Sequence, residues 1–484
     1  MKKILAGIKE DLTVKNKDFI ITAAQCVGIA VSTLLSIYFG FFVWVTLALC
    51  IICAFTSRGG RAAYVLAFFL PLAFVTNIEY SFHPLALIIL VCAIAGRLLI
   101  SVIIRFIRKK EKVKILPIIG AVVLIISFAI SSVLGHRPEI LGCIVFLYCL
   151  YILRADIDLK EVMFLLFAGI ATSMFLGLFV TPDTRVFSLL FTNWRVGHRY
   201  GGLNIDPNIF ATDVIICIIF LLTLRMNNKM KFLFYPMLAF LVVCTILSGS
   251  KAGFIAIAMV FFIYFVSQLV RNIKEKRIRE FVLQGVCILA VIGIATLCLY
   301  PWLSNMLVRF NIDESGILDS ITTGRWSRIV PYMEAIFSNV WHALFGFGYG
   351  VPLIDGISSH NTFVTILFRA GIVGALCMVL WSVFLLVPII RGKRINLYNI
   401  FFFIPIIFLI GAYNHFFTAF TVYLFLVLPI LTFKASAPSS HCEERSDEAI
   451  GEAQGSERSE GSYPDPTPHP TKIPLLEKGV APAG

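Results

Sequence analysis

The sequence is poor in charged residues, and acidic residues are the scarcer kind. Only 14% of its 484 residues are Asp, Glu, Lys or Arg, whereas a soluble domain carries about 25%. Hydrophobic residues make up 59% of the chain. This balance excludes a soluble globular domain and indicates an integral membrane protein that forms one helical bundle.

The chain also lacks cysteines where a disulfide framework or a zinc site would need them. Its 12 cysteines fall almost entirely inside apolar runs, and the long polar stretch from Pro301 to Asn361 contains none. Cysteines placed in this way usually act as small packing residues. We therefore expect neither disulfides nor a zinc site. We also expect no cofactor.

Apolar runs separated by Gly, Pro and polar residues predict an all-α, polytopic transmembrane bundle of about 12 to 14 spans. No internal repeat is visible, and the first run, which starts near Phe19, is expected to act as a signal anchor. The candidate spans lie near residues 19–36, 40–55, 63–77, 84–104, 115–134, 138–153, 161–180, 209–224, 232–248, 252–270, 281–300, 362–390, 398–412 and 416–433.

The formal net charge of +13 reflects topology and does not indicate nucleic-acid binding. Lys and Arg concentrate in alternate loops, which are the cytoplasmic ones in a multi-pass protein. This rule places both termini in the cytoplasm and residues 181–208, the turn at 248–251 and the 300–361 loop on the outer side. Residues 434–484, rich in Ser, Glu, Pro and Gly, are expected to form a disordered cytoplasmic tail beyond a membrane domain of residues 1–433.

The polar stretch between Pro301 and Asn361 is the likeliest place for chemistry by its composition. Lipid offers no partners to irregular backbone, so this stretch must lie in water beside the bilayer. A row of apolar residues from Trp326 to Val340 at helical spacing predicts a helix in the membrane interface, with His342 on the same helix facing headgroups. The loop is therefore expected to be partly helical.

Three outer segments place cations beside glycines: Arg199 before Gly201-Gly202, Lys251 after Gly249, and Arg325 after Gly324. Cations, flexible glycines and helix N-termini are what a phosphate or diphosphate group requires. Each cation alone is more often a lipid headgroup contact or a helix start. His360 adds a group that can accept a proton near neutral pH, although a lone histidine is more often structural.

Two other polar features lie outside these three segments. Asp156-Ile157-Asp158 has the spacing of a divalent-metal site, but it falls in a short cytoplasmic loop away from the outer cations. Arg369 is placed about two turns inside a predicted span, where a charge should face the bundle interior or a polar cavity. We treat Arg369, Asn361 and Arg195 as candidate substrate contacts.

Together these motifs resemble the superfamily of bacterial O-antigen ligases and O-antigen polymerases over residues 190–375. The motifs are Arg199-Tyr200-Gly201-Gly202 with Asp206-Pro207-Asn208, Ser248-Gly249-Ser250-Lys251-Ala252-Gly253, Gly324-Arg325-Trp326, Gly346-Phe347-Gly348, His360-Asn361-Thr362-Phe363 and Gly371-Ile372-Val373-Gly374. The resemblance implies a metal-independent, inverting glycosyltransferase of the bacterial inner membrane, with its active site facing the periplasm.

By position, Arg325 and Arg199 resemble the family's diphosphate-binding arginines, and His360 matches the base for the acceptor hydroxyl. Lys251 stands where the family usually has arginine, and it lacks the two-pronged grip of a guanidinium on phosphate oxygens. The implied partners are a polyprenyl diphosphate-linked glycan donor, a lipid A core or glycan acceptor, and membrane lipid.

The sequence favours the ligase branch over the polymerase branch through its Gly-Arg-Trp, Gly-Phe-Gly and His-Asn motifs. A transporter of lipid-linked sugars is the alternative from another class, and it predicts related halves and charges at mid-membrane. A membrane scaffold is a further alternative. Sugar identity, oligomeric state and the purpose of the tail are not encoded in recognisable motifs.

Overall fold

The computed structural model describes residues 21–57, 64–72, 76–77, 80–81, 84–109, 159–179, 200–203, 207–224, 231–274, 276–300, 325–348, 361–391 and 401–412, with isolated positions between them. All of them belong to the first of two units into which the chain divides, Met1–Lys434. The 434–484 segment and the predicted spans near 115–134 and 416–433 lie outside the described residues.

The described residues are almost entirely helical, apart from a two-residue antiparallel pair, β1 (Thr76–Asn77) and β2 (Tyr80–Ser81). A helix at Ile21–Tyr38 precedes the labelled elements. These are α2 (Phe42–Thr56), α3 (Tyr64–Phe69), η2 (Leu70–Leu72), α4 (Pro84–Lys109), α7 (Leu159–Phe179), α9 (Pro207–Thr223), α10 (Lys231–Ser248), α11 (Lys251–Lys274), α12 (Ile278–Cys298), α15 (Trp326–Phe337), α16 (Val340–Phe345), α17 (Thr362–Arg391) and α19 (Phe403–Ala412).

Five of these helical segments are long and apolar enough to cross a membrane: Ile21–Tyr38, Ile89–Ile107, Lys160–Gly177, Lys251–Lys274 and Phe281–Cys298. Four shorter apolar helices accompany them, at Phe42–Thr56, Pro207–Thr223, Phe232–Ser248 and Thr362–Cys377. The helical class is therefore confirmed, and the helices fit a multi-pass membrane protein.

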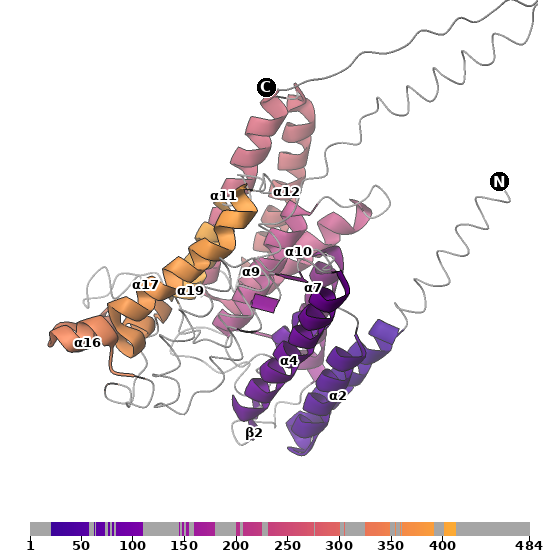
Figure 1. Ribbon diagram of the computed structural model, residues 1–484. Helices are drawn as coiled ribbons and strands as arrows, with labels where there is room; N and C mark the ends of the chain where they lie inside the picture. Colours follow the sequence, from indigo (N-terminus) through magenta and orange to yellow (C-terminus); the bar gives the residue numbers. More distant parts are fainter. Residues whose placement is uncertain are drawn as a thin grey trace, which may run out of the picture. The chain divides into compact units, whose positions relative to one another are not determined.

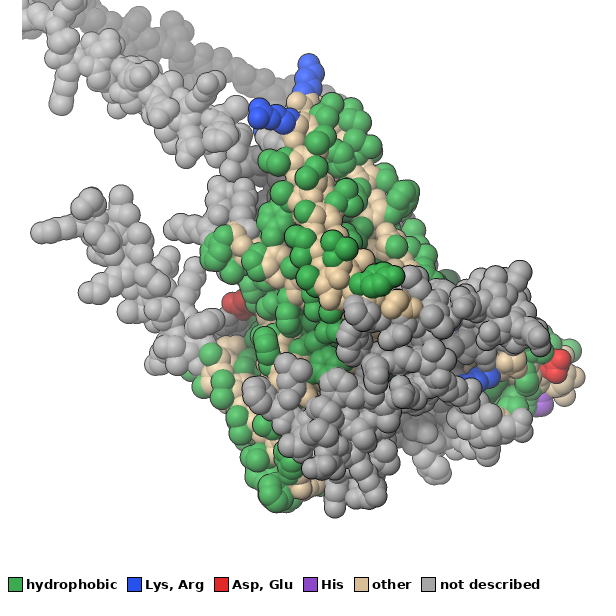
Figure 2. All heavy atoms as spheres, turned by 180° about the vertical axis from the view of Figure 1, so that it is seen from behind, with side chains coloured by type: hydrophobic (Ala, Val, Ile, Leu, Met, Phe, Trp, Pro, Cys, Tyr) green, Lys and Arg blue, Asp and Glu red, His purple; other side chains and the backbone are tan. Residues whose placement is uncertain are grey.

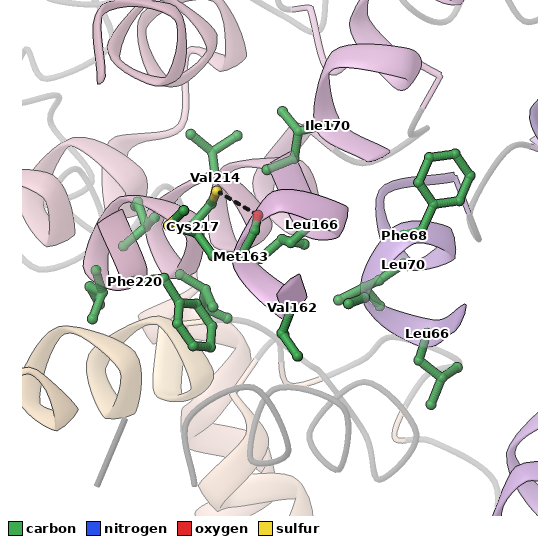
Figure 3. Close-up of a cluster of buried hydrophobic side chains, with 14 of the residues drawn as sticks. Leu66, Phe68, Leu70, Val162, Met163, Leu166, Ile170, Val214, Cys217 and Phe220 are labelled. Carbon is green, nitrogen blue, oxygen red and sulfur yellow. Dashed lines mark hydrogen bonds between the residues drawn. The ribbon is translucent and has the colours of Figure 1, made fainter. Parts of the chain in front are cut away.

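Helix α9 lies at the centre of the packing, in contact with α7, α10, α11 and α19 (Figure 1). Every side chain from Phe210 to Leu222 is buried, as expected for a helix that is apolar on all sides. Figure 3 shows Val214, Cys217 and Phe220 of this helix facing Met163 and its neighbours on α7. α9 therefore forms a buried axis among the described helices.

The segment near residues 63–77 is not the continuous span that the sequence predicts. It forms α3, then the short 3-10 helix η2, and then strand β1. Pro71 lies inside η2 and has no backbone N–H to continue a helix. All nine side chains from Tyr64 to Leu72 are buried, so the irregular backbone is shielded by protein, the only setting in which a bilayer tolerates it.

Close contact with α7 holds this broken segment in place. A Cβ atom built on Gly169 of α7 would lie 2.2 Å from the carbonyl oxygen of Phe68. Figure 3 shows Leu70 pointing toward Leu166 of α7. The lack of a side chain at Gly169 thus allows the backbone of α3 to approach α7 directly.

Helices α11 and α12 form an antiparallel hairpin whose exposed surface is apolar. Figure 2 shows hydrophobic side chains along the hairpin and Lys and Arg side chains at its tip. Exposed residues at that tip include Lys274, Lys276, Arg277 and Arg279. A basic loop between two apolar helices is typical of the cytoplasmic side.

Cys50 and Cys53 form a C-x-x-C pair on α2. Both thiols are free and buried in the apolar core. Every cysteine in the described part of the chain is likewise a free thiol. At these positions the side chains act as small packing residues.

Candidate functional site

Residues 200–203, the first segment predicted on the outer side, are fixed to two helices. The amide of Tyr200 donates to the carbonyl oxygen of Leu247 at the end of α10, at 2.8 Å. Its phenol donates to the carbonyl oxygen of Met174 on α7, at 2.7 Å. Burial raises the pKa of this phenol above its ordinary value, so it remains a donor at physiological pH. Two of the three predicted cation-bearing segments therefore meet here.

A glycine is required at the centre of this segment. Gly202 has a φ of +63°, and a Cβ atom there would lie 2.7 Å from the hydroxyl oxygen of Ser173. The same hydroxyl accepts a hydrogen bond from the amide of Leu203, at 2.9 Å. The Gly201-Gly202 pair therefore allows the chain after Arg199 to turn against α7.

The second outer segment is a tight turn between α10 and α11. Gly249 has a φ of +56°, and the hydroxyl of Ser248 accepts from the amide of Ser250, at 3.3 Å. The hydroxyl of Ser250 in turn accepts from the amide of Gly253, at 3.1 Å, which is the pattern of a helix N-cap. These bonds fix the position of the first residue of α11, Lys251.

Lys251 is a buried cation at the positive end of a helix dipole. Its side chain is 7% exposed, and it occupies the first position of α11. A positive charge is unfavourable at a helix N-terminus, whereas an anion is favoured there. The ammonium group and the first-turn amides of α11 therefore both favour a negatively charged ligand at this place.

Arg325, the cation of the third segment, lies just before α15 and reaches a distant helix. Its guanidinium donates to the carbonyl oxygen of Ala412, the last residue of α19. Arginine commonly bonds carbonyls at the C-terminal end of a helix. This bond uses one of five guanidinium N–H donors and fixes where the planar group lies.

The residues on both sides of His360 are held by a small hydrogen-bond network. The carboxamide oxygen of Asn361 accepts from the amides of Phe363 and Val364, at 3.0 and 3.1 Å, and so caps α17. The hydroxyl of Ser359 lies 2.9 Å from that of Thr365. The Asn361 oxygen, which the sequence assigns to substrate contact, thus serves as a helix cap.

The same end of α19 also contacts the start of α17. A Cβ atom on Gly411 would lie 2.8 Å from the ring of Phe363, one residue before the carbonyl that Arg325 holds. Arg325 and the segment flanking His360 are therefore brought to one place at the end of α19. Because α19 also packs along α11 and α9, it connects this group to the helix that begins at Lys251.

Arg369 lies two residues before a break in α17. Gly371 adopts a φ of 64° and a ψ of −171° inside α17, so the helix is broken there. The break leaves carbonyls without their usual helical donors, and the Gly-Phe-Gly turn supplies them. The amide of Phe347 donates to Phe368, at 2.7 Å, and the amide of Gly348 donates to Arg369, at 2.9 Å.

The side chain of Arg369 closes this junction. Its guanidinium donates to the carbonyl oxygen of Gly348, at 3.0 Å, and lies over the ring of Phe368. The side chain is 9% exposed. Arg369 therefore fixes the glycine turn to α17, and its assignment as a substrate contact stays a prediction.

The apolar row from Trp326 to Val340 does not form one continuous helix, and His342 does not share a helix with Trp326. α15 ends at Phe337, and α16 begins at Val340 with the side chain of Asn339 as its N-cap. His342 lies on α16, where its ring stacks on Phe347 with centroids 4.0 Å apart. The apolar row divides accordingly: one side of α15 packs on Phe368 of α17, and the other side is exposed.

The sequence interpretation missed one buried acid, Asp213 in the middle of α9. Its side chain is fully buried. An ionisable residue inside an apolar span is expensive and is a functional candidate by default. The available signal was its position: it is the single acidic residue in the run from Pro207 to Thr223.

Several predicted residues lie outside the described part of the chain: Arg195, Arg199, His360 and the pair Asp156 and Asp158. Tyr200, which follows Arg199, and Ser359 and Asn361, which flank His360, are described. Among the residues that the structure describes, no group of three or more His, Cys, Asp or Glu side chains could hold a metal ion.

Taken together, the described residues assemble two groups from the segments that the sequence predicts on the outer side. The first contains the 200–203 segment and the turn before Lys251, and the second contains Arg325, Asn361 and the junction at Arg369. Comparison of the chain with known protein families, with curated proteins and with solved structures finds no match.

Proposed function

We propose that this protein is an O-antigen ligase-like glycosyltransferase of the bacterial inner membrane. It would move a glycan from a polyprenyl diphosphate carrier to a sugar hydroxyl of lipid A core on the periplasmic face. The proposal includes about 12 to 14 spans with both termini in the cytoplasm. It rests on the motif resemblance described above and on the arrangement of the outer residues.

The observation that carries the proposal is that Arg325 and Phe363 both reach the end of α19. Arg325 donates to Ala412, and the neighbouring Gly411 contacts Phe363, three residues after His360. A transferase needs a cation near the leaving group and a base near the acceptor. The contacts at the end of α19 support such a pairing of Arg325 with His360.

The reaction would be a single displacement at the anomeric carbon. The acceptor hydroxyl oxygen forms a new bond to that carbon as the bond to the diphosphate oxygen breaks, with inversion of configuration. The imidazole of His360 accepts the hydroxyl proton. The electron pair of the broken bond stays on the departing polyprenyl diphosphate.

The charge on that leaving group is what the cations would stabilise. Fixed positive groups aimed at developing charge often supply the largest part of a rate enhancement. Arg325 would hold the diphosphate, and Arg199 would reach it from the segment that Tyr200 fixes. Lys251 adds a buried cation at a helix start, where first-turn amides also face an anion. With these residues no divalent metal is required in the reaction.

The direct test is the lipopolysaccharide glycan profile of cells that express single variants. His360→Ala and Arg325→Ala should insert normally and lose glycan transfer. Because Arg325 also holds Ala412, Arg325→Lys is added, as it keeps a donor for that carbonyl. Arg328→Ala is the matched control: it removes a cation one turn further along α15 and should leave transfer unchanged.

A deletion strain separates the two branches of the superfamily. Loss of a ligase leaves bare lipid A core and accumulates lipid-linked polymer, whereas loss of a polymerase leaves core bearing single units. Normal transfer by both His360→Ala and Arg325→Ala would exclude the enzyme. That result would favour a transporter of lipid-linked sugars or a membrane scaffold.

A further inference from the structure

The break at Gly371 divides α17 into two parts with different surroundings. From Thr362 to Ala370 all described side chains except Phe363 are buried or half-buried. Beyond the break, Val373, Leu376 and Leu380 are exposed at the spacing of one helix face. The stretch after Gly371 reaches Arg391, which is roughly the 20 residues that a span requires. A row of exposed apolar side chains on α17 therefore follows Gly371.

Helix α16 is fixed to α17 at this level. A Cβ atom on Gly371 would lie 2.3 Å from the carbonyl oxygen of Leu344, and one on Gly346 would lie 2.6 Å from the amide of Ala370. Backbones this close can meet only because both positions are glycine. Figure 1 shows α16 against α17. α16 is thus held at the point where the exposed apolar row of α17 starts.

The free surface of α16 is strongly apolar. Val340, Trp341 and Phe345 are 71%, 67% and 54% exposed. The rings of Trp341 and Phe345 stack on each other, with centroids 5.9 Å apart. Large exposed apolar groups gathered on one helix mark a contact surface.

Helix α15 continues this surface. Trp326, Val330 and Phe337 are exposed and share one helix face by their spacing. The opposite face packs Tyr332 and Ile336 against α17. α15 therefore has two apolar faces, of which α17 covers one.

We propose that the exposed apolar faces of α15 and α16 insert shallowly into the outer leaflet of the membrane. Lipid is the occupant because this surface starts where α17 begins to expose its own apolar row, at Gly371. Two tryptophans on the surface fit the interfacial region, where tryptophan is enriched. The helices lie in the membrane plane as amphipathic elements do.

This inference does not depend on the proposed enzymatic activity. It makes the 325–348 part of the outer loop a membrane-embedded element. An amphipathic carrier lipid and this part of the loop would then both lie at the interface between the membrane and water.

Tryptophan fluorescence tests the insertion on the full chain reconstituted into phosphatidylcholine vesicles. The chain contains six tryptophans, so five are replaced by Phe to leave Trp341 alone, and a second variant leaves Trp326 alone. A third variant keeps Trp44 of α2, which is exposed on an apolar helix, as the lipid-facing reference. Lipids brominated near the headgroup or near the bilayer centre, and aqueous acrylamide, serve as quenchers.

We expect blue-shifted emission from Trp341 and Trp326, with loss of most intensity in lipids brominated near the headgroup. The bilayer-centre bromines should quench less. Strong quenching by acrylamide without quenching by either bromolipid would overturn the proposal in favour of a solvent-exposed surface. Protection from all three quenchers would overturn it in favour of a protein partner.

Discussion

Replacement of Gly371 by alanine should destabilise the protein strongly, because two independent features require glycine there. The backbone has a φ of 64° and a ψ of −171°, a region that is essentially restricted to glycine and costs other residues about 1–3 kcal/mol. The added methyl group would also lie 2.3 Å from the carbonyl oxygen of Leu344. That neighbour is backbone and cannot rotate away.

The size of the destabilisation follows from the contacts that must shift to admit the methyl group. If α16 shifts to admit the methyl group, the hydrogen bonds from Phe347 and Gly348 to α17 weaken, each with a net contribution of about 1 kcal/mol. Together with the backbone strain, the free energy of unfolding should fall by about 3 kcal/mol or more. On the scale of soluble domains of 150–250 residues, this corresponds to roughly 6–12 °C in the unfolding midpoint.

Thermal unfolding of the purified protein in detergent, followed by near-UV circular dichroism or thiol accessibility, measures this loss. Gly293→Ala on α12 is the matched control, since a Cβ atom there meets nothing within 4 Å and alanine is the better helix former. The control should be as stable as the parent chain. Equal stability of Gly371→Ala and the control would refute the conclusion that α17 is broken at Gly371 and packed there against α16.

Three further substitutions test other parts of the account. Gly169→Ala should destabilise the fold by about 2 kcal/mol or more, because its methyl group would meet the backbone of Phe68; the unfolding midpoint in detergent checks this. Ser250→Ala should cost about 1 kcal/mol in the same measurement through loss of the α11 N-cap. Lys251→Gln should raise the KM for a lipid-linked diphosphate donor about tenfold, the equivalent of about 1.4 kcal/mol. Lys276→Gln, at the tip of the α11–α12 hairpin, is the control and should leave this KM unchanged. An unchanged KM in both variants would remove Lys251 from the donor site.

The sequence predicted several helices well because hydropathy and helix-ending residues agree. The predicted spans 209–224, 232–248 and 252–270 correspond to α9, α10 and α11 within a few residues. Their boundaries carry local signals, such as Pro207 at the first position of α9 and the Ser248-Gly249-Ser250 turn. Hydropathy alone is enough to locate such elements.

The sequence could not reveal the broken elements for a physical reason. An apolar run around Gly371 has the same composition whether its helix is continuous or interrupted, because the break is stabilised by a distant turn at Gly346. The segment at 64–72 is similar, since contact with Gly169 stabilises its short helices. The division between α15 and α16 did carry a signal: Asn339 is a good N-cap residue.

The assignment of Lys251 and Arg325 to a site on the outer side stays a prediction from sequence order and charge. The structure shows how each residue is held: Lys251 begins α11, and Arg325 donates to the carbonyl oxygen of Ala412. Motif position could not indicate that Asn361 caps α17 or that Arg369 holds Gly348. Such assignments depend on hydrogen bonds between residues far apart in the chain.

The most direct test of the proposed function is donor turnover by the purified protein in proteoliposomes, with a polyprenyl diphosphate-linked glycan and either lipid A core or free glycan as acceptor. The parent chain should consume the donor and release polyprenyl diphosphate in the presence of EDTA, and His360→Ala should lose this activity while it keeps its unfolding midpoint. Turnover by His360→Ala at the parental rate, or none by the parent chain with either acceptor, would contradict the assignment.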